Sequence, residues 1–488
     1  MNLINIRFFS ILFCILVAQT AGVQAARPNV LMIVVDDMND WVGCMGGHPN
    51  ASTPNIDRLA ERGVLFTNAH CAAPVCNASR VATMTGLRPN STGVYSNSVK
   101  WHQKLENVPS IPQHFKSNGY EVVGGGKVYH HMPGFNRESD WDFYFKQRFD
   151  GHFQQQLHRG EDVSSFRYPN GFPLNGIPAV KNLSRPPRNA REFDWGPLDR
   201  DVLETGDGEM IRWAAEFLKT EREKPFLLVA GIYRPHLPFY APKKYFDRLT
   251  SDAVAVPSVL ENDVADLPEL GKAFANQRRE DLRLVKAEGK YREMIHAYLA
   301  SISYADALVG ELLKALDSSP NSNETIVVFW SDHGWHFGEK EHLHKMTLWE
   351  RATRIPFIVS MPGATQLSPN CEAAIGLVDL FPTLISLCDL PSISRLDGND
   401  ISPLLSNPHI KWEVPALTTH GFGNHAVRTN RWRYIRYADG GEELYDHLND
   451  PNEWHNLAVK AGTVKIRERL SQWLPVANAK PLSNKRIP

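Results

Sequence analysis

The sequence predicts an α/β protein in which a mostly parallel or mixed sheet is flanked by helices. Short continuous runs of aliphatic and β-branched residues recur along the 488-residue chain, as expected for strands buried on both faces. They alternate with amphipathic segments of helical period, the pattern that builds an α/β sandwich. Near the C-terminus, short strand-like segments with Asn, Gly and Asp turns predict a separate small antiparallel sheet.

The N-terminus predicts a signal peptide over residues 1–25. Arg7 precedes a short apolar run over residues 8–17, and Val23-Gln24-Ala25 resembles a small-x-small cleavage site. The alternative is an uncleaved N-terminal anchor. The run is too short for a convincing membrane span and no other segment resembles one, so we expect export without stable membrane insertion.

The first half of the predicted sheet begins directly after this leader. Residues 29–35 (NVLMIVV) predict a strand buried on both faces. Thr53-Pro54, an N-cap followed by proline at the first helical position, begins a helix that ends at Gly63. Residues 111–118 predict another helix and residues 120–123 another strand.

The second half follows an irregular stretch. Residues 141–200 are rich in Arg, Asn, Gly, Pro and aromatic residues, and we interpret them as ordered loop because aromatics such as Phe143, Tyr144 and Trp195 favour burial. Helices are predicted at 209–218 and 291–316, and buried strands at 225–230 and 325–330. A catalytic domain over residues 26–410 and a smaller subdomain over 411–488, ending in a helix, account for the whole mature chain.

Net charge and the number of cysteines limit the kinds of function that the chain could have. The formal net charge is −1 and the sequence pI is near 7.0, so no global field favours nucleic acid or an anionic membrane. Loss of the leader leaves Cys44, Cys71, Cys76, Cys371 and Cys388. Export permits disulfides, but five is an odd number, so at least one cysteine is unpaired or committed to chemistry.

Acidic residues follow two of the predicted strands. Asp36-Asp37 comes after the first, and Asp332-His333 follows the strand at 325–330. Ligands bind beyond the carboxyl ends of strands in such sheets, and hard divalent cations collect oxygen ligands from separate loops. A metal site is therefore one interpretation, although His333 is unusual for calcium or magnesium; capping or turn acids are the other.

Basic residues follow other strands. Lys127 and His130 lie in GGGKVYH, which fails the P-loop pattern because Val128 follows the lysine, so a solvated turn is the alternative. His236 lies in RPHLPF, where prolines would present it rigidly, or else it is a buried structural histidine. Lys345, beside two histidines in EHLHKM, belongs to a metal cluster, an anion-binding loop or a hydrophilic surface loop.

The stretch CAAPVCNASRVATMTG decides among these interpretations. A tyrosine-phosphatase loop would need Arg at Asn77, and neither a papain-like site nor a zinc knuckle finds its partner residues. What remains is Cys76-x-Ala78-x-Arg80 followed by Thr85-Gly86. This pattern resembles the signature of the type I, formylglycine-dependent sulfatases. Together with the motifs above and the ELYDHLNDPNEWHNL tail, the resemblance covers the mature chain, and within the family it is most like iduronate-2-sulfatase and its bacterial relatives.

The resemblance implies a fold, a cofactor and a set of roles. The fold would be an alkaline-phosphatase-like sandwich, and a maturase would oxidise Cys76 to Cα-formylglycine, whose hydrate is the nucleophile. One calcium ion would be bound by Asp36, Asp37, Cys76, Asp332 and His333. The remaining roles are these: Arg80 orients the hydrate, Lys127 and Lys345 hold the sulfate oxygens, His130 supports hydrate turnover and His236 protonates the leaving alcohol.

The expected substrate is a sulfated oligosaccharide or polysaccharide, and the most specific expectation is a 2-O-sulfate on a non-reducing-end uronate. There are two alternatives. One is a sulfatase for another sulfated polysaccharide sugar, and the other is a phosphodiester or phosphonate hydrolase of the same superfamily. The chain departs from the signature at Ala78, where proline is commoner. Conversion of Cys76 therefore depends on a maturase that accepts alanine.

Overall fold

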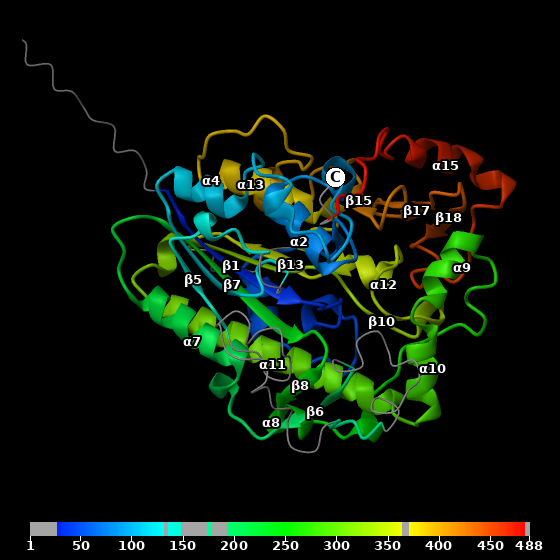
Figure 1. The fold of residues 1–488 in the computed structure, drawn as a ribbon, viewed down its shortest axis with the longest axis horizontal. Coiled ribbons are helices and arrows are strands. Elements are labelled where there is room, and N and C mark those ends of the chain that lie inside the picture. Colours follow the sequence, from blue (N-terminus) through cyan, green and yellow to red (C-terminus); the bar gives the residue numbers. More distant parts are fainter. Residues whose placement is uncertain (1–26, 131–134, 148–172, 178–192, 364–369, 484–488) are drawn as a thin grey trace, which may run out of the picture.

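The computed structural model describes residues 27–130, 135–147, 173–177, 193–363 and 370–483 (Figure 1). The predicted signal peptide lies outside these residues. No helix within the described ranges is long and apolar enough to cross a membrane.

A seven-stranded mixed sheet forms the centre of the molecule, which confirms the predicted α/β architecture. Its strands lie in the order β2-β13-β9-β1-β7-β4-β5. β1 pairs in parallel with β7 and β9, whereas β13 runs antiparallel to β9. The strand bounds are β1 Asn29–Asp36, β2 Val64–Leu65, β4 Glu121–Gly126, β5 Phe143–Phe145, β7 Phe226–Pro235, β9 Thr325–Ser331 and β13 Phe357–Ser360.

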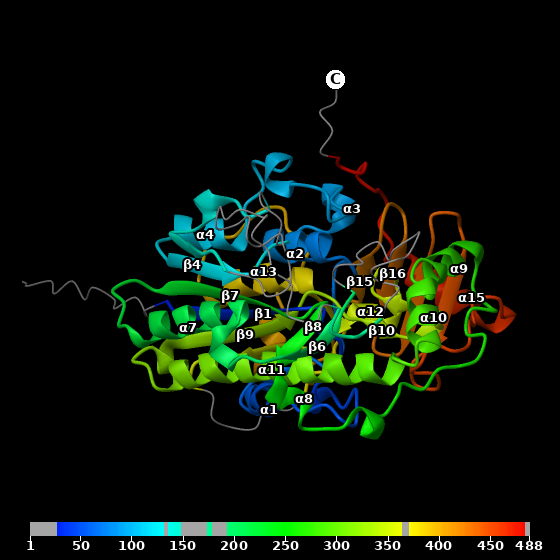
Figure 2. The same cartoon turned by 60° about the horizontal axis from the view of Figure 1, so that its bottom comes forward.

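Helices cover both faces of this sheet, as Figure 2 shows. Along β1, which is buried throughout, Leu31, Ile33 and Val35 face one helical layer while Val30 and Met32 face the other. This alternation explains why the strand reads as one continuous apolar run. One layer contains α1 Pro54–Glu61, α7 Gly206–Lys219 and α11 Tyr291–Asp317, and the other contains α2 Cys76–Thr85, α4 Ile111–Ser117 and α13 Leu380–Leu387.

A four-stranded antiparallel sheet follows near the C-terminus, as predicted. It comprises β15 Ala416–Thr419, β16 His425–Arg428, β17 Trp432–Arg436 and β18 Glu442–Asp446, and α15 Val464–Ser471 packs on it through Leu470. The boundary at residues 410/411 stays a prediction. β15 reaches back to the main domain, because Thr419 N donates to Ala72 O at 2.9 Å.

Shorter elements connect these units. The remaining strands are β3 Ala69–His70, β6 Trp195–Leu198, β8 Phe239–Pro242, β10 His336–Phe337, β11 Leu343–His344, β12 Arg354–Ile355 and β14 Ile375–Gly376. The remaining helices are α3 Pro89–Thr92, α8 Lys243–Phe246, α9 Glu269–Asn276, α10 Arg279–Ala287, α12 Glu350–Thr353 and α14 Ser402–Ser406. Figure 1 shows α9 beside the C-terminal sheet.

The stretch 141–200 contains two short strands where a loop was expected, while residues 173–177 form a turn as predicted. β5 joins the edge of the central sheet in parallel with β4, and β6 pairs with β8. Trp195 is buried as expected, but Phe143 is 51% exposed because its strand is the last in the sheet. Residues 148–172 and 178–192 of this stretch lie outside the described residues.

Candidate active site

The carboxyl ends of the parallel strands carry the predicted polar residues. Asp36 and Asp37 end β1, Asp332 and His333 follow β9, Lys127 follows β4, and His236 follows β7. Because these strands are neighbours in the sheet, their ends meet at one edge. Residues nearly 300 positions apart in the sequence are thereby joined: Asp37 N donates to Asp332 Oδ1 at 3.0 Å.

Cys76 is the first residue of α2 and is fully buried at this edge. Its Sγ lies 3.2 Å from Lys345 Nζ, 3.3 Å from His333 Nε2 and 3.9 Å from Lys127 Nζ. Burial opposes ionisation of the thiol, but the two lysines and His333 outweigh burial and hold its pKa well below the usual range. The helix N-terminus adds a partial positive charge at the same point.

Arg80, one turn further along α2, is fully buried and joins two of the strands. Its Nε donates to Asp332 Oδ2 and its Nη2 to Asp36 Oδ1, both at 2.9 Å. Its Nη1 donates to the carbonyl oxygens of Lys127 and Val128. These contacts make Arg80 the organiser of the acids and of the Lys127 turn; its predicted contact with a hydrate at position 76 stays a prediction.

The three acids have different partners. Asp36 accepts from Arg80 and Lys127, and these cations outweigh the effect of burial and lower its pKa. Asp37 Oδ1 accepts from Lys345 Nζ at 2.5 Å. Asp37 Oδ2 is buried and accepts no hydrogen bond; its nearest ionic neighbour is His236 Nε2 at 3.7 Å. Burial raises the pKa of Asp332 to about 6.

This donor set fits a divalent cation. Asp37, Cys76, Asp332 and His333 each offer a ligand atom within 4.8 Å of the others. Asp36 instead groups with Asp37 and His236. A buried carboxylate oxygen without a hydrogen-bond donor, such as Asp37 Oδ2, is stabilised by a cation. The structure therefore brings four of the five predicted ligands into one cluster and leaves Asp36 beside it, bound to Arg80 and Lys127.

The two predicted catalytic histidines lie at the same edge. His236 is fixed by its Nδ1 contact with Leu237 O at 2.5 Å, and Asp37 outweighs burial to raise its pKa. His130 is buried and interacts with Cys76; burial lowers its pKa against that interaction. All ten predicted site residues thus converge on one region.

Several residues that support the site were not predicted. Tyr298 of α11 donates its hydroxyl hydrogen bond to Asp37 O at 2.7 Å and accepts one from Asn39 N at 3.0 Å. Ser79 Oγ donates to Asp332 O at 2.6 Å. Ser79 lies inside the signature, so the sequence could have identified it as a site residue. Tyr298 lies in a regular amphipathic helix, where no motif distinguishes it from a core residue.

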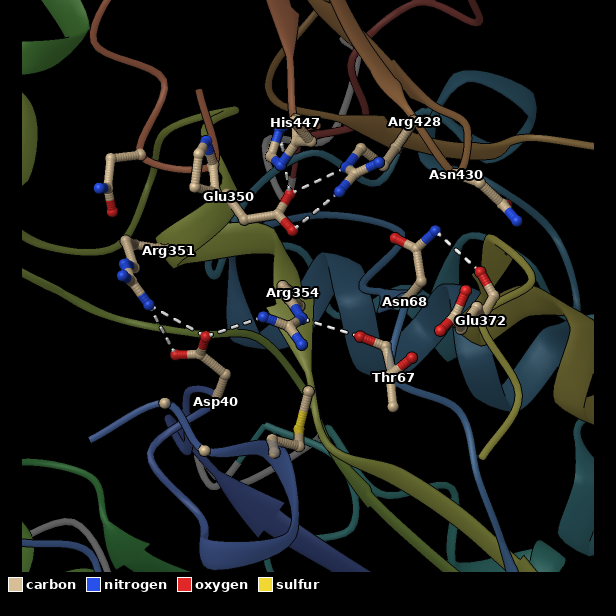
Figure 3. A pocket seen from close by; sticks show the side chains of 15 residues that line it. Asp40, Thr67, Asn68, Glu350, Arg351, Arg354, Glu372, Arg428, Asn430 and His447 are labelled. Atoms are coloured by element: carbon tan, nitrogen blue, oxygen red, sulfur yellow. Dashed lines mark hydrogen bonds and ion pairs between the residues drawn. The ribbon is translucent and has the colours of Figure 1, made fainter. Parts of the chain in front are cut away.

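A polar cavity of about 400 Å³ lies elsewhere, between the main domain and the C-terminal sheet (Figure 3). None of the ten site residues lines it. Most of its charges are already paired: Asp40 accepts from Arg351 and Arg354, and Glu350 accepts from Arg428. We therefore assign the cavity to the domain junction and not to the chemistry.

Residues 28–390 match the family model described as "Sulfatase". The chain belongs to the sulfatase family. A second model, "N-sulphoglucosamine sulphohydrolase, C-terminal", matches residues 338–480. The family identifies the protein as a sulfuric ester hydrolase.

Individual sulfatases resemble nearly the whole chain. A sulfatase of Formosa agariphila is 34% identical, covering 93% of this chain and 88% of its own. The iduronate 2-sulfatase of Mus musculus is 32% identical over 78% of this chain and 72% of its own.

Solved structures share the fold. A 2-O GAG sulfatase superposes with a TM-score of 0.68 at 24% identity, covering 91% of this chain and 90% of that one. The phosphonate monoester hydrolase of Agrobacterium radiobacter gives 0.73 at 21% identity, covering 91% and 94%. The predicted alkaline-phosphatase-like sandwich is thus confirmed.

Proposed function

We propose that this sulfatase removes the 2-O-sulfate from a uronate at the non-reducing end of a sulfated glycan. The proposal uses calcium as the divalent cation and Cα-formylglycine at position 76, made from Cys76 by a maturase. The similarity to an iduronate 2-sulfatase supports the choice of sugar and sulfate position. Export after removal of residues 1–25 is part of the same proposal, because extracellular glycans are the substrates it would meet.

One observation carries the chemistry: two lysines and a histidine converge on a single buried sulfur at the N-terminus of a helix. Lys345 Nζ lies 3.2 Å from Cys76 Sγ, and Lys127 Nζ lies 3.9 Å from it. Such fixed positive charge, in a site closed to water, stabilises negative charge that develops on the nonbridging oxygens of a sulfate ester.

The balance of charge also favours an anionic substrate. Asp36, Asp37 and Asp332 face Arg80, Lys127 and Lys345, so these buried acids and bases are formally equal in number. A divalent cation bound by Asp37, Asp332 and His333 would leave the site positive, and would polarise a sulfate oxygen as a Lewis acid. The same positive charge would attract a sulfate anion more strongly than a neutral sugar hydroxyl, which favours binding of sulfated over unsulfated chain ends.

The side chains divide the proton transfers between them. The formylglycine hydrate supplies a nucleophile with two hydroxyl groups, so that one can carry the sulfate and the other can release it. Lys127 and Lys345 orient the sulfate oxygens. His236, whose pKa is raised by Asp37, holds a proton that it can donate to the leaving sugar oxygen. His130, whose pKa is lowered by burial, can accept a proton at position 76.

A desulfation screen over defined sulfated oligosaccharides tests the substrate. We expect release of sulfate from a non-reducing-end 2-O-sulfated uronate and little from 6-O- or N-sulfated glucosamine. An aryl phosphodiester assayed in parallel tests the phosphonate hydrolase alternative. Activity confined to other sulfated sugars contradicts the sugar assignment while leaving the sulfatase assignment in place.

Mass spectrometry of the tryptic peptide of residues 63–80 tests the nucleophile. This peptide begins after Arg62, ends at Arg80 and contains Cys76. We expect formylglycine in active protein, and a folded, nearly inactive protein where the residue stays cysteine. An active preparation that contains only unmodified cysteine would falsify the formylglycine mechanism.

A further inference from the structure

The loop that carries Lys345 has an unusual backbone. We call residues 338–346, between β10 and α12, the Lys345 loop. Four of its non-glycine residues have positive φ: Lys340 at 54°, Glu341 at 51°, His344 at 80° and Met346 at 75°. Side chains with a Cβ rarely adopt this conformation, and it persists only where surrounding contacts over-determine it. Lys345 itself lies between two of these residues.

One segment supplies several of the contacts that hold the loop from outside, alongside contacts from Pro74, Arg351 and Glu453. We call residues 263–281, which include α9 and the start of α10, the clamp segment. Lys340 is buried against it, with Nζ 2.8 Å from Asp263 Oδ1 and its backbone N 2.9 Å from Asp263 Oδ2. Further along the loop, His344 Nε2 lies 3.0 Å from Asp281 Oδ2, and Glu341 pairs with Arg279.

His342 links the clamp segment to Lys345 directly. Its ring is fully buried, with Nδ1 3.0 Å from Ala275 O at the end of α9 and Nε2 2.8 Å from Lys345 O. A neutral imidazole carries one N–H, so His342 donates to one of these two carbonyl oxygens at a time. In either tautomer the ring lies between the end of α9 and the backbone of Lys345, while the Lys345 side chain reaches Asp37 and Cys76.

The clamp segment is itself anchored. Phe274 and Ala275 pack in one apolar cluster with Leu348 and Trp349, which follow the loop, and with Tyr445 of the C-terminal sheet. Figure 1 shows α9 next to the C-terminal sheet, with α10 further from that sheet. The segment therefore has a rigid surface behind it, as a positioning element requires.

We propose that the clamp segment positions the ammonium group of Lys345 for sulfate binding, with Asp263, Asp281 and His342 as positioning residues. This inference rests on the role given to Lys345 under the proposed function. Loss of a clamp contact lets the left-handed loop residues relax toward ordinary backbone angles. Lys345 Nζ then leaves the point 3.2 Å from the sulfur of residue 76.

Asp281→Ala tests the inference, with Arg283→Ala as the matched control. Arg283 lies on the same helix, but its pair with Glu280 is exposed and includes no residue of the loop. Asp281→Ala is expected to lower kcat/KM for the sulfate ester by about 10-fold to about 100-fold, the cost of misplacing a substrate-positioning group. Asp281→Asn, whose amide oxygen still accepts from His344, is expected to restore most of that loss. Equal losses in Asp281→Ala and Arg283→Ala contradict the proposal.

A double-mutant cycle separates positioning from general damage. Asp281→Ala introduced into Lys345→Ala is expected to change kcat/KM less than about twofold, because its effect passes through the lysine that is already gone. Additive losses overturn the clamp. All variants are compared at equal formylglycine content, so that differences in the conversion of Cys76 do not affect the ratios of kcat/KM between variants.

Hydrogen exchange gives a readout that does not depend on turnover. The amides of residues 338–346 are expected to exchange faster in Asp281→Ala than in the wild type or Arg283→Ala, with the β1 and β9 amides unchanged. Unchanged loop exchange together with unchanged kcat/KM overturns the clamp. Wild-type activity in Lys345→Ala instead contradicts the role given to Lys345 under the proposed function, independently of the clamp geometry, whereas no activity of the wild type on any sulfate ester would contradict the proposed function itself.

Discussion

At the scale of single residues, the two carboxylate oxygens of Asp37 have different surroundings, and one of them favours a bound cation. One of its oxygens is bound by Lys345, and the other is buried without a hydrogen-bond donor. Leaving a charged oxygen in that state is costly, so the geometry favours a cation that completes its contacts.

Asp37→Asn is therefore expected to lose the stabilisation that the proposed calcium ion would give. In the wild type, calcium at about 100 times its Kd would add about 2.7 kcal/mol, and a chelator would remove that gain; the variant should show little change in either direction. Thermal unfolding with and without calcium measures the difference. Asp40→Asn is the control, because Asp40 pairs with Arg351 and Arg354 outside the ligand cluster. A calcium shift that survives in Asp37→Asn contradicts the metal site.

Arg80 contributes stability as well as order. Its removal leaves Asp36 and Asp332 buried without their shared partner, and breaking such a buried pair costs about 3–5 kcal/mol. We expect Arg80→Ala to lower the urea midpoint accordingly. Arg62→Ala, which breaks a partly exposed pair with Asp317, should cost about 0–1 kcal/mol. Similar losses in both variants would show that Arg80 does not organise the acids.

At the scale of one element, α2 explains why the signature tolerates two residues at position 78. Cys76 begins the helix, so Ala78 lies in its first turn, where backbone N–H groups have no carbonyl four residues earlier within the helix. Proline removes only such a spare donor there. Alanine in this chain and the commoner proline are therefore both compatible with the helix.

Ala78→Pro is expected to keep stability within about 1 kcal/mol of the wild type. Val81→Pro, two turns into the same buried helix, should cost about 3 kcal/mol or more because it removes an internal hydrogen bond. Thermal unfolding distinguishes the two, and the peptide of residues 63–80 shows whether proline raises formylglycine content. A large loss of stability in Ala78→Pro would mean that Ala78 serves packing against Met346 instead.

At the scale of the whole molecule, the main domain and the C-terminal sheet meet through buried charges. Figure 3 shows Glu350 of α12 with Arg428 of the sheet and with His447, whose Nε2 lies 3.8 Å from Glu350 Oε2. Glu350 also accepts from Arg433 of the sheet. Burial opposes the charge of Glu350, but Arg428, His447 and Arg433 outweigh it and hold its pKa well below 4.5. The junction thus depends on an ionised glutamate.

Glu350→Gln is expected to destabilise the protein by about 3–5 kcal/mol at neutral pH, because it leaves the buried guanidinium of Arg428 without its carboxylate and removes one of the two carboxylates that pair with Arg433, the other being Glu453. A depressed pKa contributes stability that is complete above the unfolded value of about 4.5 and is lost as pH falls below it. The gap in urea midpoint between wild type and variant should therefore be widest above pH 5 and shrink toward pH 3. A gap independent of pH contradicts the ionised pair.

Much of this molecule was open to prediction from local patterns. Strands such as residues 29–35 are buried on both faces, so their apolar runs are visible without an alignment, and the acids at their ends follow from the rule for open α/β sheets. The C-terminal sheet was predicted from its short strand-like segments and the Asn, Gly and Asp residues of the turns between them. The ends of the elements were predicted less accurately. The strand expected at 225–230 extends to Pro235, because its pairing with β1 and β4 continues past the apolar run.

Other features escaped prediction because they depend on neighbours remote in sequence. The stretch at 143–145 becomes a strand only because the edge of β4 is available. α9 packs through Phe274 and Ala275 against the C-terminal sheet, whereas α10 packs through Leu282 and Val285 on the main core. Tyr298 supports Asp37 from a helix 261 positions away. No local signal could have revealed these partners.

The sequence by itself determined the chemistry available to this protein: the Cys76 signature, the acids, the lysines and the histidines, each tied to a strand end or a motif. Tertiary structure alone decided how those groups are held. It placed Arg80 between Asp36 and Asp332, left one oxygen of Asp37 without a donor, and set the Lys345 loop against residues 263–281. The physical reason is that residue types follow from local sequence, whereas burial and pairing depend on which distant segments the sheet brings together.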